Sequence, residues 1–296
     1  MKTLAIVTPT YNRADLLNVA FKSLSAQTNK DFVWYVIDDG STDNTAEKIK
    51  ELTSKAEFEI VYQFKENGGK HTAINTALDL VKEEIMLILD SDDELTENAV
   101  ETVVTDYKDI KDDNSVCGMG YLKSHKDGKV VGVQYTQDGV VDNFTNQRIN
   151  CDTYGDKCEV FKTQVFKQYK FPEFSGERFL SESAVWCKMS LDYNMKFFNK
   201  AIYVCEYLEG GLSDNVQKRL FKNPLGAVES YVMMSSKQAK FKAKLKYTIA
   251  YTVYSLAAKV KLKQQFKRVA SKLMYLATLI PAWMLYLIKK HKFKDK

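Results

Sequence analysis

The sequence lacks the features that mark several common classes of protein. Its five cysteines are an odd number with no Cys-x-x-Cys pair, which favours reduced, mostly buried thiols in a cytosolic protein over a disulfide framework. The apolar run at the N-terminus covers only residues 4–7, which is too short for a secretory signal. The longest apolar run, residues 273–288, is shorter than the roughly 20 residues of a membrane span and contains Pro281. We expect an interfacial or buried helix there.

Two nucleotide-binding signatures are also missing. The chain has no Walker loop, because the Gly-x-x-x-x-Gly-Lys-Ser/Thr spacing does not occur. It has no Gly-x-Gly-x-x-Gly after the first apolar run, which argues against an enzyme that uses a dinucleotide. No internal repeat or long low-complexity linker is present. The 296 residues therefore form one large domain or a domain with an appendage.

Acidic residues are nearly absent from the last 60 positions. From Lys237 onward there are 16 Lys and Arg but one acid, Asp295, which gives +15. The preceding 236 residues hold 43 − 16 = 27 basic and 38 − 1 = 37 acidic side chains, which gives −10. This asymmetry indicates an acidic globular domain with a basic appendage for an anionic partner. No recognition motif for nucleic acid accompanies the charge.

Short apolar runs alternate with amphipathic segments over the first 110 residues. The pattern predicts strands at 4–8, 32–37, 58–64 and 85–89, and helices at 14–27, 43–54 and 70–81. Two further strands are expected at 116–122 and 130–134, a helix at 182–191, and helices almost throughout after Pro224. Alternation of this kind predicts an α/β fold with a mainly parallel sheet, whose ligand lies beyond the carboxyl ends of the strands.

Polar segments follow all four of the first strands, at residues 8–13, 38–43, 67–71 and 90–93. In a parallel sheet these segments share one edge, so they can converge on one ligand. In this order they resemble the family 2 glycosyltransferases, which have the GT-A fold: a Rossmann-like central sheet flanked by helices. The resemblance is specific over residues 3–100 and looser to about residue 215.

The resemblance implies an organisation and an activity. It implies a catalytic domain at 1–215, with a nucleotide-binding half at 1–110 and an acceptor half at 111–215. A basic, amphipathic α-helical extension follows at 216–296. The implied reaction moves a sugar from a UDP-sugar to an acceptor hydroxyl, in the assembly of bacterial polysaccharide, capsule or lipid-linked glycan.

Donor-binding residues are expected in all four segments. Tyr11 presents a ring on which a base can stack, for about 1–3 kcal/mol, although a loop aromatic that fills the sheet edge is an even alternative. The resemblance implies that Asp39 accepts the N3 proton of uracil, which favours UDP. Glycines at 68 and 69 permit close backbone approach to phosphate, and Lys70 adds charge. The complete set of donor-binding candidates is Pro9, Tyr11, Arg13, Asp39, Asn67, Gly69, Lys70, Asp90 and Ser91.

Residues 90–93 carry three carboxylates directly after an apolar strand. Asp90 and Asp92 project to the same side of an extended segment, and Mg²⁺ and Mn²⁺ prefer oxygen ligands and bridge to substrate phosphates. The resemblance implies that Asp92 contacts a divalent metal, Mn²⁺ or Mg²⁺, and that Asp90 lies near the ribose. The alternative is a solvated helix start, since more acids follow Asp92.

The family places a Glu-Asp pair at the head of a helix roughly 90 residues after the metal motif. Here Glu182 is followed by Ser183, which departs from that pattern. Glu182 is therefore the candidate catalytic base, with Glu177 one loop earlier; the alternative for Glu182 is an acid favoured by the helix dipole. Residues 209–213, rich in glycine, are a candidate closing loop or a simple turn.

The basic C-terminal region mixes lysines with aromatic and aliphatic residues at helical spacing over 241–260 and 266–288. Such faces suit an anionic membrane surface, which predicts a cytoplasmic enzyme held peripherally at the inner face of the cell membrane. Helices packed on the catalytic domain, or an oligomer contact, are the alternatives.

The expected mechanism is a single, metal-assisted displacement that inverts the anomeric carbon, with a glycan or lipid-linked acceptor. Two other functions compete with it. One is a nucleotidyltransferase on a related sheet, which should carry a Gly-rich loop after the first strand, unlike residues 8–13. The other is a non-catalytic membrane scaffold with a degenerate site, which Ser183 makes plausible.

Overall fold

Two units divide the chain, and each has its own core. The structure, a computed structural model, describes residues 2–206 and 216–294. Unit 1 comprises Met1–Asn143, Thr153–Lys170 and Asp192–Tyr207. Unit 2 comprises Phe144–Asp152, Phe171–Leu191 and Leu208–Lys296.

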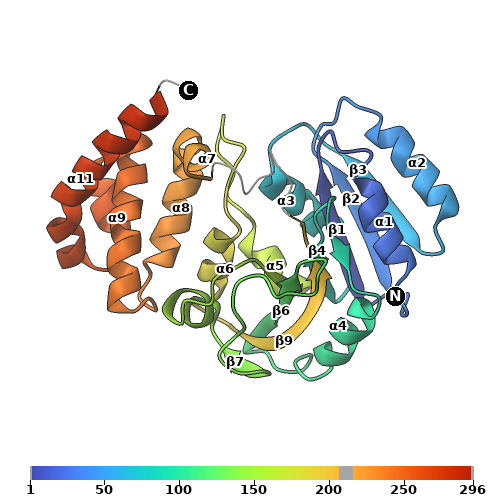
Figure 1. Ribbon diagram of the computed structural model, residues 1–296. Helices are drawn as coiled ribbons and strands as arrows, with labels where there is room; N and C mark the ends of the chain where they lie inside the picture. The colour runs from blue at the N-terminus through green and yellow to red at the C-terminus, as the bar shows by residue number, and fades with distance from the viewer. Residues whose placement is uncertain (1, 207–215, 295–296) are drawn as a thin grey trace. The chain divides into compact units, whose positions relative to one another are not determined.

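Unit 1 is built on one mixed sheet, in the order β3-β2-β1-β4-β8-β6-β9-β5 with β7 beside β9. The four expected strands are present and mutually parallel: β1 (Leu4–Thr10), β2 (Phe32–Asp38), β3 (Glu59–Phe64) and β4 (Ile85–Ile88). The other half consists of β5 (Glu94–Leu95), β6 (Val116–Ser124), β7 (Val140–Asp142), β8 (Lys157–Lys162) and β9 (Asn194–Val204). β8 is antiparallel to β4 and β6, whereas β6 and β9 are parallel. This is the expected α/β class with a central sheet between helices (Figure 1).

Central strands are apolar on both faces because both faces are covered. Every residue of β2 is buried, and Trp34 in that strand is fully buried with its indole N–H donating to the Thr8 hydroxyl at 2.9 Å. A run that is apolar without alternation is typical of a covered parallel strand. The edge strand β3 is exposed or half-exposed throughout, as an edge position permits.

Helices α1 (Leu17–Ser25), α2 (Thr45–Lys55), α3 (Lys70–Leu80) and α4 (Ala99–Tyr107) flank the sheet, with the short α5 (Thr163–Phe166) and η2 (Lys167–Tyr169). Asp43, two residues before the first residue of α2, accepts the Thr45 N–H at 3.1 Å. The strand expected at 130–134 is wrong: Val130 makes only an isolated bridge to Ser124. Strand β6 takes its partners from β8 and β9, which are distant in sequence.

Unit 2 is helical, as expected after Pro224. It contains η1 (Asn146–Asn150), α6 (Ser183–Met189), α7 (Val216–Lys222), α8 (Pro224–Met234), α9 (Phe241–Ala257), α10 (Leu262–Arg268) and α11 (Lys272–Lys294). Helices α8, α9 and α11, orange to red, lie side by side (Figure 1). Tyrosines dominate their core: Tyr231 stacks on Tyr254 at 5.3 Å between ring centroids, and Tyr251 and Tyr275 are buried.

Candidate functional site

The segments that follow β1, β2 and β3 are joined by backbone hydrogen bonds at the carboxyl edge of the parallel strands. The Asp39 N–H donates to the Thr10 carbonyl at 2.8 Å, and the Lys65 N–H donates to the Asp38 carbonyl at 2.9 Å. The fourth segment follows β4, where the Leu89 N–H donates to Val7 in β1 at 2.9 Å. The expected convergence of residues 8–13, 38–43, 67–71 and 90–93 on one edge therefore follows from the strand order β3-β2-β1-β4.

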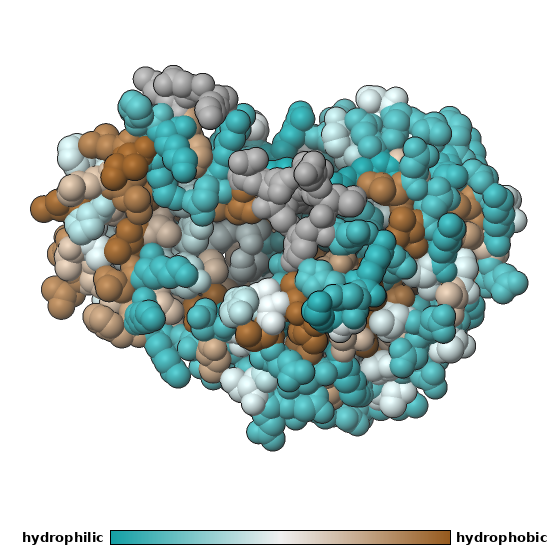
Figure 2. Space-filling model, in the orientation of Figure 1, coloured by the Kyte–Doolittle hydropathy of each residue, from teal (hydrophilic) through white to brown (hydrophobic). Residues whose placement is uncertain are grey.

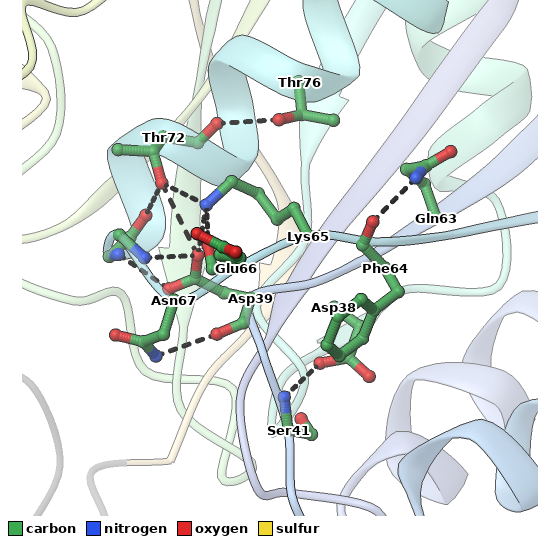
Figure 3. Close-up of polar contacts among 12 residues, drawn as sticks. Asp38, Asp39, Ser41, Gln63, Phe64, Lys65, Glu66, Asn67, Thr72 and Thr76 are labelled. Atoms are coloured by element: carbon green, nitrogen blue, oxygen red, sulfur yellow. Dashed lines mark hydrogen bonds and ion pairs between the residues drawn. The ribbon is translucent and has the colours of Figure 1, made fainter.

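Asp39 anchors the loop after β3 (Figure 3). Its carboxylate accepts the Gly68 N–H at 2.9 Å and the Gly69 N–H at 2.7 Å, and it pairs with the Lys65 ammonium at 2.8 Å. The Asp39 carbonyl accepts the Asn67 side-chain N–H at 2.8 Å. Asp39 is only 4% exposed. The Asp39 carboxylate thus accepts the two glycine N–H groups that precede α3. The sequence predicted that the backbone at Gly69 would approach a phosphate of the ligand.

Gly40 permits the close approach of this loop. It has φ +84°, and a Cβ built at this position would lie 2.7 Å from the Asn67 backbone nitrogen. Gly69 also has a positive φ, +96°, at the residue before α3. Both positions need glycine because L side chains disfavour this backbone region. The glycine pattern therefore positions the loop against Asp39.

Two cations hold the carboxylates that were predicted for metal and ribose. The Arg13 guanidinium lies 3.0 Å from Asp92 Oδ2, and the Lys70 ammonium lies 2.7 Å from Asp90 Oδ1. These four side chains are between 16% and 32% exposed, so they are open to a ligand. Partial burial opposes ionisation of Asp90, but Lys70, with Lys123 and Arg13, lowers the pKa of this carboxyl below its usual value.

The remaining donor-binding candidates line the same edge. The Tyr11 side chain is 45% exposed, which leaves its ring accessible for stacking. Its neighbour Asn12 has φ +50° and accepts the Thr42 N–H at 2.7 Å, so the first two segments are joined there. Pro9 is half-buried in β1, and Ser91 is buried between the two acids.

The residues fit a metal that arrives with a nucleotide, not a preformed metal cage. Among residues 2–206 and 216–294, no group of three or more His, Cys, Asp or Glu side chains is placed to hold an ion. Asp92 offers one partly exposed carboxylate. Mg²⁺ in proteins commonly uses one or two carboxylates together with substrate phosphates. Asp92 is therefore the residue that would hold a divalent ion beside a diphosphate.

Sequence reasoning missed three residues of this edge: Lys65, Lys123 and Tyr203. Lys65 pairs with Asp39, and Lys123 lies 3.8 Å from Asp93. The Tyr203 hydroxyl donates to Asp93 at 2.8 Å. Burial raises the pKa of Asp93 to about 6, although Lys123 opposes the shift. Lys123 directly follows the apolar run at 116–122, and this is the one signal in the sequence that pointed to the cluster.

The two candidate bases belong to unit 2, whereas the donor-binding candidates belong to unit 1. Glu182 is half-buried and directly precedes α6, and its carbonyl accepts the Val185 and Trp186 N–H groups. The Glu177 carboxylate accepts the N–H groups of Leu225 and Gly226, both at 2.8 Å. Glu177 therefore caps α8, which leaves Glu182 as the candidate. The candidate closing loop at 209–213 lies outside the described residues.

Comparison with known families decides the class. The family model described as "Glycosyl transferase family 2" matches residues 5–174, which is more than half of the chain. The chain is a family 2 glycosyltransferase. Membership of this family favours a transferase over both alternatives, the nucleotidyltransferase and the non-catalytic scaffold.

Relatives and solved structures agree with the assignment. The glycosyltransferase GlyG of Streptococcus pneumoniae serotype 4 is 26% identical over 220 residues, covering 71% of this glycosyltransferase and 72% of GlyG. The "GalNAc(5)-diNAcBac-PP-undecaprenol beta-1,3-glucosyltransferase" of Campylobacter jejuni is 25% identical over 265 residues, covering 87% and 82%. The crystal structure of S. aureus TarS 1–349 in complex with UDP-GlcNAc superposes with a TM-score of 0.65 at 20% identity, covering 99% and 92%. The last similarity supports the fold alone.

We expect Asp39→Asn to weaken UDP binding, because the amide leaves the Lys65 ammonium without its ion pair and loosens the loop after β3. Loss of one partner of a buried ion pair costs about 3–5 kcal/mol, so stability also falls. Calorimetric titration with UDP and MnCl₂ measures the affinity, and thermal unfolding measures stability.

Asp106→Asn is the matched control for this substitution. Asp106 in α4 has a side chain that is 9% exposed and pairs with Lys200 at 2.7 Å, outside the strand-end segments. It should lose comparable stability and keep UDP affinity. Equal loss of affinity in the two variants would contradict a role for Asp39 in donor binding.

Proposed function

We propose that this glycosyltransferase moves one sugar from a UDP-sugar to an acceptor hydroxyl with inversion of the anomeric carbon. The observation that carries the proposal is the row of paired charges on one sheet edge. Four carboxylates, Asp39, Asp90, Asp92 and Asp93, each pair there with one cation from Lys65, Lys70, Arg13 and Lys123. Tyr11, with an exposed ring, lies on the loop after β1 in the same row of segments.

The residues of this edge divide between nucleotide and diphosphate. Tyr11 stacks on the base. Asp39 accepts the N3 proton of uracil on Oδ2, which has one internal donor, the Gly69 N–H, whereas Oδ1 accepts from Lys65, Gly68 and, at 3.5 Å, Thr72. Arg13 and Lys70 are the two most exposed of the four cations, at 31% and 24%, and we assign them to offset charge on the diphosphate. A divalent ion on Asp92 would add Lewis-acid stabilisation of the leaving diphosphate.

The chemical step needs one base. Glu182 takes the proton of the acceptor hydroxyl. The acceptor oxygen then forms a bond to the anomeric carbon as the bond from that carbon to the diphosphate oxygen breaks, and UDP leaves. A single displacement inverts the configuration, so an α-linked donor yields a β-linked product.

What the relatives act on supports the choice of substrates. TarS has been solved with UDP-GlcNAc, which supports a UDP-sugar donor. The C. jejuni relative is named for a glycan on undecaprenyl diphosphate, which supports a lipid-linked or polymeric glycan acceptor. An acceptor on a polyprenyl lipid is held in a membrane, which supports the peripheral location that we propose at its cytoplasmic face.

The rate of UDP-sugar hydrolysis tests whether the donor is a UDP-sugar. The purified protein should hydrolyse at least one UDP-sugar slowly to UDP, faster with MnCl₂ than with EDTA. Asp92→Asn should lower this rate on the order of 10²–10³-fold, as when one electrostatic contact to the leaving group is lost, with the same thermal unfolding midpoint. Asp109→Asn is the control, because Asp109 pairs with Lys196 at 2.9 Å in the same unit. A screen of UDP-sugars that yields no UDP would contradict the proposal.

The base is tested separately from the donor. Glu182→Gln should abolish transfer to an acceptor while UDP affinity stays at the wild-type value, because the amide cannot take a proton. Glu177→Gln should weaken the cap of α8 and lower stability but keep the transfer rate per folded molecule. If Glu177→Gln abolishes transfer and Glu182→Gln does not, the assignment of the base is wrong.

Helix α11 supplies the surface that we assign to the membrane. Among residues 2–206 and 216–294, one helix is long enough and apolar enough to span a bilayer. It covers Lys272–Phe293 of α11, with a mean hydropathy of 1.2. One side of it, with Tyr275, Thr278 and Ala282, is buried in unit 2, which favours a helix that lies on a bilayer. Its exposed apolar residues include Leu273, Leu276, Ile280, Trp283, Met284 and Ile288.

The exposed face of α11 is uncharged along its middle and basic at its ends. No charged residue lies in 273–288, and Lys272 precedes this stretch while Lys289, Lys290 and Lys292 follow it. The uncharged stretch is about 24 Å long at 1.5 Å per residue. Figure 2 shows apolar side chains gathered over the C-terminal helices on the face drawn. An apolar face with a basic surround matches an anionic lipid surface in charge and in polarity.

Ile280→Glu should reduce co-sedimentation with phosphatidylglycerol vesicles, because it places a charge in the middle of the exposed face, where Ile280 is 73% exposed. The double substitution Lys290→Glu with Lys292→Glu should reduce vesicle binding more than Ile280→Glu does. The remaining binding should no longer depend on the charge of the lipid. Val141→Glu is the control, since Val141 is 50% exposed in β7 of unit 1. If Ile280→Glu leaves vesicle binding unchanged and converts a dimer to a monomer, the face binds a second copy instead.

A further inference from the structure

A buried lysine lies beneath the segment that carries Asp90 and Asp92. The Lys123 side chain is only 12% exposed, and its ammonium lies 3.8 Å from Asp93 Oδ2 and 3.7 Å from the centroid of the Tyr203 ring. Lys123 and Tyr203 are register partners in the parallel pair of β6 and β9, next to a register shift after Leu122. A cation over an aromatic face is attracted by the ring quadrupole. The two strand ends are thereby tied together under the acidic segment.

The Tyr203 hydroxyl joins this pair to both ends of the segment. It accepts the backbone N–H of Asp90 at 3.0 Å and donates to the Asp93 carboxylate at 2.8 Å. The Asp93 N–H donates to the Asp90 carbonyl at 3.2 Å and closes the turn. After the turn, Leu95 in β5 is paired with Tyr203 in β9. One fully buried hydroxyl thus fixes the backbone from which Asp90 and Asp92 project.

Lys123 supplies charge as well as packing. Burial alone would lower the pKa of this ammonium, but Asp90 and Asp93 raise it above its ordinary value. Lys123 therefore stays positive at neutral pH. An opposite charge in a site of low polarity is a strong favourable interaction for the two carboxylates. Without it the segment would hold three acids against only Arg13 and Lys70.

We propose that Tyr203 and Lys123 are positioning residues for Asp90 and Asp92: Tyr203 fixes the backbone of residues 90–93, and Lys123 offsets their charge. Neither residue touches the substrate in this assignment. The inference rests on the proposed function only for the identity of the ligand that the two aspartates meet. Its first part concerns the ligand-free protein and can be tested there.

Hydrogen–deuterium exchange of the ligand-free protein tests the backbone contact. In Tyr203→Phe the amide of Asp90 loses its acceptor, so its exchange should speed up on the order of tenfold, which corresponds to about 1.4 kcal/mol. Tyr121→Phe is a matched control: Tyr121 is also fully buried, and its hydroxyl contacts the Asp106 carboxylate at 3.2 Å in the same unit. The control should leave exchange at residues 90–93 unchanged, with a similar loss of thermal stability.

Titration with UDP and MnCl₂ tests the consequence for the site. Tyr203→Phe should raise the dissociation constant on the order of tenfold, because the aspartates lose their fixed spacing, while Tyr121→Phe should not change it. Lys123→Met should weaken UDP and manganese binding, and Lys123→Arg should restore part of it by restoring the charge. A structural role without positioning would lower stability in all four variants and leave the affinity unchanged.

The two possible failures are distinguishable. Unchanged exchange at Asp90 in Tyr203→Phe overturns the inference, whatever UDP does. Equal affinities in Tyr203→Phe and Tyr121→Phe overturn it as well. A wild-type protein that binds no UDP with manganese overturns the proposed function instead, and the exchange experiment then still decides whether Tyr203 holds the segment.

Discussion

Charge neutralisation at the carboxyl edge of the sheet is the constraint on which the site depends. Four acids lie in the segments at this edge, and each has a cation as its neighbour. Isolated buried charges are costly, so the mainly buried acids, Asp39 and Asp93, require their partners for the fold to be stable. The pairs differ in exposure: those of Asp39 and Asp93 are mainly buried, whereas those of Asp90 and Asp92 are open. Buried pairs hold loops, and the more exposed pairs are accessible to a ligand.

The sequence predicted the parallel half of the sheet because its signals are local. Each strand from β1 to β4 is an apolar run followed by polar residues and a helix or turn, so strands, helices and the shared edge could all be read from residues 3–100. The second half could not be read in this way. Strand β6 has partners about 40 and 80 residues later along the chain, and the strand expected at 130–134 was wrong for that reason.

The same limit explains which site residues were missed. Tyr11, Asp39 and Asp92 lie in polar segments after strands, where their residue types make them candidates. Lys123 and Tyr203 matter only because β6 and β9 are neighbours, and no periodicity in the sequence indicates that pairing. Asp39 shows a further limit. Its position was predicted, but its bonds to Gly68 and Gly69 depend on how the loop after β3 folds back.

The contact between Gly40 and Asn67 links two loops that have no covalent connection nearby. The Asn67 backbone lies where a side chain at position 40 would begin. Because backbone atoms have no alternative rotamers, neither Gly40 nor Asn67 can relieve a clash by moving a side chain. Any residue larger than glycine at position 40 has to displace the whole 67–69 segment, and the Asp39 carboxylate with it. Sequence change at this edge is therefore easier at exposed side chains, such as Tyr11, than in the backbone frame behind them.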